Sequence, residues 1–429
     1  MTRGRPSNRR LLATLLLAVS VVAASCSDDN KASSDGDATT TTVDVSQVLG
    51  TPNKATGEPV KVGLITEGGS EAIGSQSALT VTGATMAVKY ANEYLGGIAG
   101  RPIELVTCGN QATPAGAQDC ANQMVQDGVV AVTLPFTGYG AATAPVLTKA
   151  GIPYVTLSGN SSEELRAPGA FAITGGYPGT LGAFAQHAKE QNFKKFAMIV
   201  IDVPSATQAA EQLGGMVFGN AGVDFQVITA APGTPDLIPQ LQSAVDGGAQ
   251  AVGVTGDVTF CTSFLQAFQT LNPDVAKYVI GPCIDPTVIK TLGDVLAGSF
   301  MTTSTSNEGA DAKIYAGMVA KYAADEKVDP DPAVSVGVAA GTAAVMNFVR
   351  AMSGLSGDVN KDTVLAQMKA AKDVPLWTGD GQTFTCDGTV VAIMPNVCSA
   401  AFFIGKLDNK GHVLDPTPVD ASALFVIKK

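Results

Sequence analysis

Short apolar runs alternate with longer segments of helical periodicity along most of this chain, and this alternation restricts the fold more than any other feature. An apolar run at 60–65 precedes a segment at 79–94 in which Met86, Tyr90 and Tyr94 recur at a spacing of four, as on one face of a helix. We expect further strands and helices in turn at 103–106, 114–127, 129–134, 141–150 and 152–155. Strands that alternate with helices of about ten to fifteen residues are typical of βαβ units, so the sequence predicts an α/β fold with a parallel sheet.

The same alternation starts again near residue 180, which predicts a second parallel sheet. The expected strands and helices lie at 180–191, 195–201, 208–221, 225–228, 235–247, 251–254, 260–271 and 278–280. Beyond Phe300 we expect helices at 310–325, 333–353 and 361–371, and then β structure at 382–413 with a hairpin turn near Gly388. A chain of 429 residues exceeds the roughly 250–300 that one core can hold, so we predict two lobes, with the late helices packed on one of them.

The N-terminus has the features of a secretory signal peptide. Residues 1–10 are basic and include Arg3, Arg5, Arg9 and Arg10, and residues 11–24 are almost wholly apolar. A basic segment followed by an apolar run and small residues is typical of such signals, here 1–25. The apolar run is shorter than the roughly 20 residues that a membrane-spanning helix needs.

The segment Ala23-Ala24-Ser25-Cys26 resembles a bacterial lipobox, in which the cysteine becomes the new N-terminus and carries lipid. Ala23 stands where such signals usually have Leu. The polar stretch that follows contains Thr39-Thr40-Thr41-Thr42 and has no apolar periodicity, so we predict a flexible tether at 26–58. The expected location is extracytoplasmic, anchored to the cell membrane by lipid on Cys26. The alternative is an ordinary signal peptide followed by a cysteine without lipid.

The cysteines after Cys26 are even in number, and the predicted location is outside the cytoplasm, where disulfides form. We therefore predict that these cysteines are paired in disulfides. Their spacing makes pairing between sequence neighbours the simplest arrangement, although the sequence alone cannot choose the connectivity: Cys108–Cys120, Cys261–Cys283 and Cys386–Cys398. A zinc site is the rival interpretation. Its usual closely spaced cysteine pairs are missing and the chain has only 2 His, so we expect no metal.

Composition and motifs argue against two large classes of function. The net charge is −11, and no basic stripe appears, so we expect no nucleic-acid partner. The histidines, His187 in a predicted helix and His412 in a C-terminal turn, do not border the loops in which a site is expected. No sequence signature of a serine hydrolase, a metalloprotease or a nucleotide-binding enzyme is present. We therefore expect a protein that is not an enzyme and needs no cofactor.

Several stretches, in this order, resemble the type I periplasmic binding proteins of the branched-chain amino-acid-binding group, which are substrate-binding lipoproteins of ABC transporters. The resemblance covers about 60–413. The stretches that carry the resemblance are, in order along the chain, Val62-Gly63-Leu64-Ile65, Thr82-Gly83-Ala84, Gly151-Ile152-Pro153-Tyr154-Val155, Ile280-Gly281-Pro282 and Leu376-Trp377-Thr378-Gly379.

The resemblance implies two parallel-sheet α/β lobes joined by a hinge of three crossings, near 173–176, 299–303 and 382–385. Lobe 1 would then comprise 59–174 and 302–382, and lobe 2 would comprise 175–301 and 383–429. It also implies the function: the lobes trap a small polar solute, an amino acid or a related amide or carboxylate, and deliver it to an ABC permease in the membrane. We expect a monomer. The alternatives are an envelope lipoprotein that senses a ligand and signals to a membrane receptor, and a structural envelope lipoprotein.

Candidate ligand-binding residues in the first lobe lie in loops beyond the carboxyl ends of strands, where ligands of α/β sheets usually bind. The resemblance implies that two of these loops hold a ligand carboxylate, and that a residue of the first loop covers the ligand. These residues are Gln76, Thr137, Gly138, Tyr139, Ser158, Gly159 and Asn160. Two alternatives stay open. Ser158 and Asn160 could cap a helix that starts near Ser162, and Tyr139 could pack against its loop instead of stacking on a ligand.

The second lobe departs from the family pattern. In the loop that contains Ser205, Ala206 stands where relatives commonly have Tyr, and the family's carboxylate for a ligand ammonium falls near Cys283. Ser205 and Asp257 are the candidates here, with Asp202 and Asp285 in reserve; each acid could instead be a solvated residue or a helix cap. These losses put amino-acid specificity in doubt. Trp377 is expected to pack in the core or the hinge.

Overall fold

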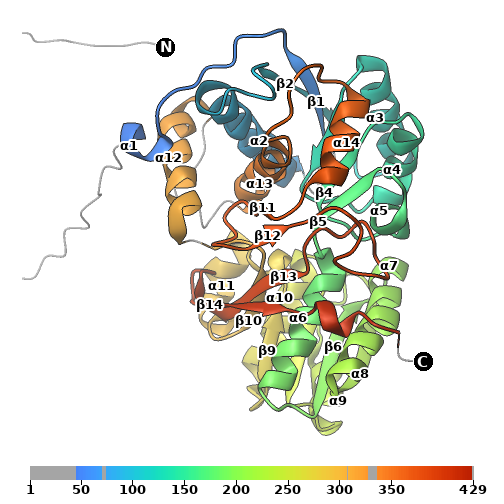
Figure 1. The fold of residues 1–429 in the computed structure, drawn as a ribbon. Coiled ribbons are helices and arrows are strands. Elements are labelled where there is room, and N and C mark those ends of the chain that lie inside the picture. Colours follow the sequence, from blue (N-terminus) through green and yellow to red (C-terminus); the bar gives the residue numbers. More distant parts are fainter. Residues whose placement is uncertain (1–44, 70–73, 307, 327–335, 428–429) are drawn as a thin grey trace, which may run out of the picture. The chain divides into compact units, whose positions relative to one another are not determined.

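The computed structural model describes residues 45–69, 74–306, 308–326 and 336–427 (Figure 1). The predicted signal peptide, Cys26 and the first part of the predicted tether therefore lie outside the described residues. Within the described ranges, none of the helices is both long and apolar enough to cross a membrane.

The first sheet has five strands in the order β2-β1-β3-β4-β5, and every neighbouring pair is parallel. Four of these strands were predicted; the fifth, β5, was not, because its short run follows β4 after only the brief helix α5. The strands are β1 (Val60–Thr66), β2 (Ile103–Gly109), β3 (Ala131–Leu134), β4 (Tyr154–Ser158) and β5 (Ala170–Thr174). The helices that connect them are α2 (Gly74–Tyr94), α3 (Pro114–Asp127), α4 (Gly140–Lys149) and α5 (Ser162–Arg166).

The late helices pack on this first sheet, as the sequence predicts. They are α12 (Gly309–Glu326), α13 (Val336–Ala351) and α14 (Lys361–Ala370), followed by a small antiparallel pair, β11 (Val374–Pro375) and β12 (Thr383–Phe384). Helix α13 lies against α2 at close range: a Cβ added to Gly83 would lie 2.0 Å from the Val338 carbonyl oxygen. It also covers β3, where the Thr133 hydroxyl donates to the Ala344 carbonyl at 3.0 Å.

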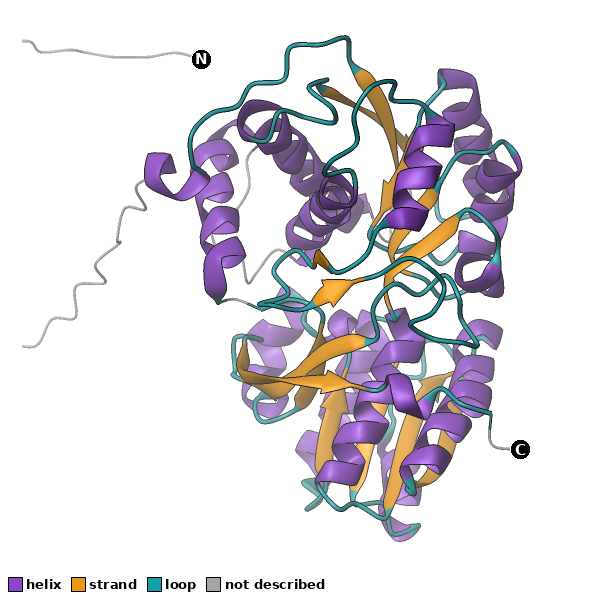
Figure 2. Ribbon diagram, viewed as in Figure 1, coloured by secondary structure: helices purple, strands orange, loops and turns teal. Residues whose placement is uncertain are grey.

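The second sheet has seven strands in the order β14-β13-β10-β9-β8-β6-β7. Strands of this sheet are the orange arrows in the lower half of Figure 2, where helices lie beside them. The strands are β6 (Lys195–Ile201), β7 (Asp224–Ala230), β8 (Ala251–Thr255), β9 (Ala276–Val279), β10 (Phe300–Thr303), β13 (Ala401–Leu407) and β14 (Val413–Asp420). Strands β6 to β10 pair in parallel, whereas β13 is antiparallel to β10 and to β14. The fold class is thus confirmed: two α/β regions, the first built on a parallel sheet and the second on a sheet in which β6 to β10 are parallel.

The helices of the second region are α6 (Gly176–Glu190), α7 (Pro204–Gln208), α8 (Gly215–Ala221), α9 (Ile238–Asp246), α10 (Val258–Leu271) and α11 (Pro286–Leu296). Two differ from the prediction. The single helix expected at 208–221 is interrupted by a π-helical segment at Ala209–Gly214, and α11 was not predicted.

The C-terminal β structure differs from the continuous segment expected at 382–413. Residues 396–398 run beside β5 of the first sheet: the Ala172 N–H donates to the Asn396 carbonyl and the Cys398 N–H donates to the Ala172 carbonyl, both at 2.8 Å. The chain joins the second sheet only with β13, later than the crossing expected at 382–385. Gly388 has a φ of 83°, as a turn residue can have, but the described strands do not form a hairpin around it. The hairpin of this segment lies between β13 and β14 instead.

The tether prediction is wrong for its last residues. A short helix, α1 (Val45–Leu49), packs near α12, and Leu49 is 3% exposed. Ala55 is also buried, and its N–H donates to the Asn92 carbonyl at 2.8 Å. The apolar side chains of Leu49 and Ala55 were too few to show periodicity in the sequence.

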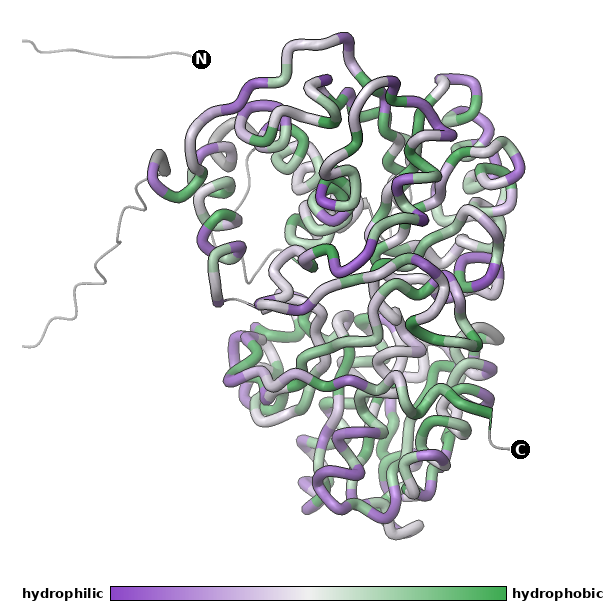
Figure 3. Tube along the Cα trace, in the orientation of Figure 1, coloured by the Kyte–Doolittle hydropathy of each residue, from purple (hydrophilic) through white to green (hydrophobic). Residues whose placement is uncertain are grey.

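Hydrophobic side chains form the interior of both regions. Many of the outer loops are hydrophilic, as the colours along the backbone show (Figure 3). One core cluster joins β1 to β5 with the late helices and Trp377, and two others lie on the faces of the second sheet. The disulfides are those of the neighbour pairing: Cys108–Cys120, Cys261–Cys283 and Cys386–Cys398. Each closes a short loop, which stabilises the fold by about 3 kcal/mol.

Candidate functional site

The order of the first sheet locates a candidate site. The chain leaves β1 toward β2 on one side and returns to β3 on the other, so the carboxyl ends of β1 and β3 form the point at which the strand order reverses. Ligands of parallel α/β sheets bind at such points, because the two following loops diverge there. Glu67 follows β1 directly, and the segment 135–139 follows β3.

The carboxylate of Glu67 bridges these two loops. Its Oε1 accepts a hydrogen bond from the Thr137 hydroxyl at 3.2 Å and from the Gly138 N–H at 2.7 Å. The Tyr139 N–H donates in turn to Thr137 Oγ1 at 3.1 Å, immediately before α4 begins. Thr137 is buried and Glu67 is half-buried. The hydroxyl and N–H groups that were expected to hold a ligand carboxylate therefore hold a carboxylate of the protein itself.

A second internal carboxylate occupies the loop after β4. Glu164 is fully buried, and its Oε2 accepts from the Asn160 N–H at 3.0 Å and the Ser161 N–H at 2.9 Å. The Tyr154 hydroxyl donates to Oε1 at 2.6 Å. Burial, and then the charge of Glu164, raise the pKa of Tyr154 well above its usual value.

The cap of α5 is Ser161, whose side chain and Glu164 form a capping box. The alternative in which Ser158 and Asn160 cap this helix is therefore wrong. The Asn160 side-chain amide instead donates weakly to the Ser158 carbonyl, at 3.4 Å.

Tyr139 packs against its surroundings. It is half-buried, and its hydroxyl donates to the Ala112 carbonyl in the loop after β2. This contact corresponds to the packing alternative, because the hydroxyl is already used within the first lobe. Gly138 is exposed beside it.

Ser158 lies where the first region passes into the second. A Cβ added to Gly176, the first residue of α6, would lie 2.9 Å from Ser158 Oγ and 2.4 Å from the Gly159 carbonyl oxygen. Gly176 has a φ of 57°, so both its backbone conformation and this close approach favour glycine.

Tyr177, the next residue, was not predicted as a site residue from the sequence. Its hydroxyl is hydrogen-bonded to the Thr255 hydroxyl at 3.0 Å, at the carboxyl end of β8. Burial raises the pKa of Tyr177 to about 12, so the phenol stays neutral. The sequence feature that could have identified Tyr177 is its position, as an aromatic residue directly after a predicted crossing.

The acidic candidates of the second lobe act as caps or lie in solvent. Asp257 is exposed and accepts from the Phe260 N–H at 2.8 Å at the start of α10. Asp285 caps α11 in the same way and accepts from the Thr287 N–H at 2.8 Å. Asp202 is exposed and accepts from the Thr207 hydroxyl at 3.4 Å. The capping alternative thus describes Asp257 and Asp285.

Gln76 and Ser205 lie in the first turns of the helices α2 and α7, but their side chains lie outside the described part of the structure. Their roles stay predictions. Among the described residues, no group of histidine, cysteine or acidic side chains is arranged to hold a metal ion.

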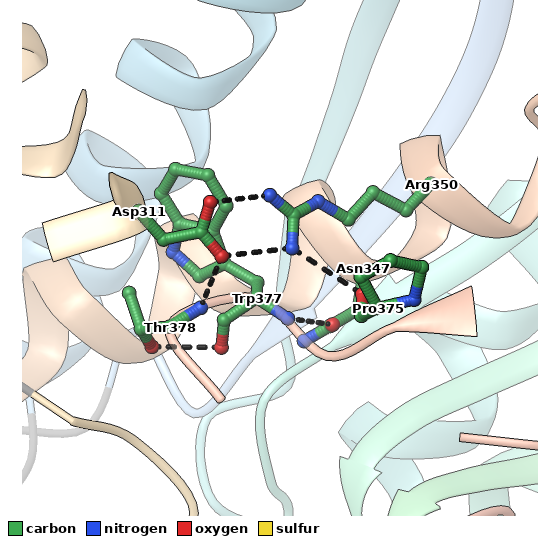
Figure 4. Close-up of polar contacts among 6 residues, drawn as sticks. All are labelled: Asp311, Asn347, Arg350, Pro375, Trp377 and Thr378. Atoms are coloured by element: carbon green, nitrogen blue, oxygen red, sulfur yellow. Dashed lines mark hydrogen bonds and ion pairs between the residues drawn. The ribbon is translucent and has the colours of Figure 1, made fainter. Parts of the chain in front are cut away.

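Trp377 belongs to the core of the first region (Figure 4). It is 2% exposed, its backbone N–H donates to Asn347 Oδ1 at 2.8 Å, and the Arg350 guanidinium lies 4.9 Å from its ring centre. Arg350 forms a two-pronged ion pair with Asp311, at 2.6 and 2.9 Å. A surface cavity of about 700 Å³ borders Trp377 and Arg350, and its lining includes none of the candidate loops.

Known proteins share this architecture. The structure is similar to that of the branched-chain amino acid transporter substrate-binding protein LivJ from Streptococcus pneumoniae in complex with isoleucine, with a TM-score of 0.67 and 19% identity, covering 84% of this chain and 99% of that chain. It is similar to a solute-binding protein of an ABC transporter from Rhodopseudomonas palustris BisB5 in complex with 3,4-dihydroxybenzoic acid, with a TM-score of 0.66 and 20% identity, covering 85% of this chain and 98% of that chain. A third similar structure is that of the fatty acid ABC transporter substrate-binding protein from Thermomonospora curvata, with a TM-score of 0.70 and 13% identity, covering 87% of this chain and 96% of that chain.

At such low identities these likenesses concern the fold, and the ligands differ among the three proteins. No curated protein matches the sequence. The sequence pattern of one family, described as periplasmic binding protein, matches residues 59–406, which is most of the chain. The chain belongs to the periplasmic binding protein family and has its type I fold.

Proposed function

We propose that this protein is the extracytoplasmic solute-binding lipoprotein of an ABC importer. It binds a small polar solute at the carboxyl ends of its two sheets and delivers it to a membrane permease. One observation carries the proposal: Ser158, in a loop of the first sheet, lies against Gly176, and the next residue, Tyr177, bonds to Thr255 at the end of β8. The polar edges of both sheets therefore meet at the first crossing.

The mechanism is closure driven by the solute. The two lobes move about the crossings between them: lobe 1 comprises 59–174 and 302–398, and lobe 2 comprises 175–301 and the chain from Ala401, because residues 396–398 still pair with β5. A solute that contacts groups of both lobes favours the closed form, because it makes more contacts there than in the open form. We propose Thr137, Gly138, Tyr139, Ser158, Gly159, Asn160 and Gln76 as the lobe 1 surface, and Ser205 and Asp257 as that of lobe 2.

Thermal unfolding with single solutes tests the proposal. Amino acids, amides, polyols and amines are added one at a time to the purified chain. A ligand at a hundredfold excess over its Kd stabilises the folded state by about 2.7 kcal/mol, which raises the Tm by several degrees. A mass spectrum of any solute that co-purifies extends the panel. If no solute changes the Tm, and none co-purifies, the transport function is wrong.

The lipid anchor is a separate part of the proposal. It rests on the Ala23-Ala24-Ser25-Cys26 segment and on the polar stretch after it. In a bacterial host, the wild-type chain should partition into detergent and gain the mass of a diacylglyceryl group. The Cys26→Ser variant should lose both properties. An equal distribution of the two chains between detergent and water would contradict lipidation and leave solute binding untouched.

A further inference from the structure

We infer that Glu67 acts as a built-in anion at the solute site, so that the site selects neutral or cationic hydrogen-bond donors and rejects free carboxylates. The inference rests on the proposed function and names the class of solute for the same site. Its first support is geometric. The Thr137 hydroxyl and the Gly138 N–H both donate to Glu67 Oε1, at 3.2 and 2.7 Å, so neither is available to a solute anion while this contact holds.

The second support is that the neighbouring loop is occupied in the same way. The N–H groups of Asn160 and Ser161 donate to Glu164 Oε2. The carboxylate of Glu164 also lies against the start of α4: a Cβ added to Gly140 would be 2.0 Å from Glu164 Cδ. An anion that approached these loops would find the N–H groups of Gly138, Asn160 and Ser161 engaged and two carboxylates already present.

The third support is the sign of the surrounding charge. The loops after β1, β3, β4, β6, β8 and β9 contain no lysine or arginine among their described residues, whereas Asp202, Asp257 and Asp285 lie in the second-sheet loops. Like charges that approach within a few ångströms in a partly buried site repel each other strongly. A second carboxylate is therefore disfavoured, and an ammonium or amide N–H is favoured.

Glu67 retains an acceptor for such a donor. Its Oε1 is used by Thr137 and Gly138, but its Oε2 accepts no hydrogen bond from any of the described residues. The half-buried side chain thus presents one fixed and one open oxygen. We assign Oε2 as the acceptor for a solute N–H or O–H group.

Matched pairs of solutes test this selection. Each pair consists of a carboxylate and its amide, such as leucine with leucinamide, or benzoate with benzamide. Affinities are measured by calorimetry for the wild type, for Glu67→Gln and for the control Glu104→Gln. The amide oxygen in the Glu67→Gln variant still accepts from Thr137 and Gly138, so the loops should stay folded. Glu104 is exposed at the start of β2, and its replacement removes the same charge at the amino ends of the strands, away from the carboxyl ends that form the site.

The wild type and the control should bind at least one amide about tenfold or more tightly than its carboxylate. Glu67→Gln should reduce this preference about tenfold. Equal or tighter binding of carboxylates by the wild type would overturn the inference and leave the transport function standing. An unchanged preference in Glu67→Gln would remove Glu67 from the role. If no member of any pair binds, and no solute of the wider panel binds either, the transport function fails together with the inference.

Discussion

The Tyr177 hydroxyl lies 3.0 Å from the Thr255 hydroxyl, so the first turn of α6 is tied to the end of β8. Thr255 is buried and Tyr177 is half-buried, and a buried hydroxyl that loses its partner costs about 1–3 kcal/mol. Tyr177→Phe should therefore lower the free energy of unfolding by about 1–2 kcal/mol.

A double-mutant cycle with Thr255→Val separates this bond from other effects. The double variant should be less destabilised than the sum of the single variants, because the second change removes a group that has already lost its partner. Urea unfolding of the four chains measures the coupling. Additive effects would show that the two hydroxyls do not interact in solution.

The ion pair of Arg350 and Asp311 connects α12, α13 and the Trp377 loop (Figure 4). Asp311 Oδ2 also accepts from the Thr378 N–H at 2.9 Å. Asp311→Ala leaves a partly buried guanidinium and a backbone N–H without this partner, so it should destabilise the fold by about 1–3 kcal/mol.

The surface pair of Lys195 and Asp224 is the control. It is longer, at 3.7 Å, and the Asp224 side chain is 70% exposed, so Asp224→Ala should cost less than about 1 kcal/mol. Thermal unfolding of both variants makes the comparison. Equal losses in the two would mean that the Asp311 network adds nothing beyond a surface contact.

Acid should weaken the second region through His187. Its Nδ1 lies 2.7 Å from the Tyr278 hydroxyl, and its ring packs 4.6 Å from that of Phe300. Burial lowers the pKa of His187 below the usual 6.5; Glu190 opposes this shift, and Lys406 adds to it. In the folded state the imidazole therefore binds a proton less readily than in the unfolded chain.

The contribution of neutral His187 to the free energy of unfolding is fully present above about 6.5, the pKa of His187 in the unfolded chain. It decreases as the pH falls below this value and stops changing below the pKa of His187 in the folded state. The slope from one such group is at most about 1.4 kcal/mol per pH unit. His187→Gln cannot take the charge, so its unfolding free energy should fall less between pH 7 and about 5. Chemical unfolding at a series of pH values gives both curves, and identical slopes would exclude His187 as a source.

Gly140 should not tolerate a side chain. An added Cβ would lie 2.0 Å from Glu164 Cδ, and the carboxylate cannot move without losing its bonds to the Asn160 and Ser161 N–H groups. Gly140→Ala should therefore cost about 1–3 kcal/mol.

Gly219 in α8 provides the matched substitution. Nothing lies within 4 Å of its Cβ position, so Gly219→Ala should be neutral or stabilise by up to about 1 kcal/mol. The Tm values of the two alanine variants should move in opposite directions or differ by several degrees. A stable Gly140→Ala chain would mean that Glu164 does not occupy the contacts described.

The candidate site shows what the sequence could and could not predict. Thr137 and Gly138 were expected at the carboxyl edge because they follow an apolar run, which is a local pattern. Glu67 follows the first strand in the same way, but nothing in the sequence indicates that its carboxylate meets the β3 loop. That contact joins residues about seventy positions apart and exists only because β1 and β3 are neighbours in the sheet.

Periodicity along the chain determined the alternation of strands and helices, the two parallel sheets and the late helices, because each depends on residues close in sequence. Tertiary structure decided which groups remain free for a solute. Hydrogen-bond donors in loops bind whichever acceptor the packing brings nearest, and here packing brings Glu67 and Glu164. It also decided that β5 is a strand and that residues from Val45 are part of the fold. These segments are buried by residues that are distant in the sequence, so their own local sequence does not indicate the burial.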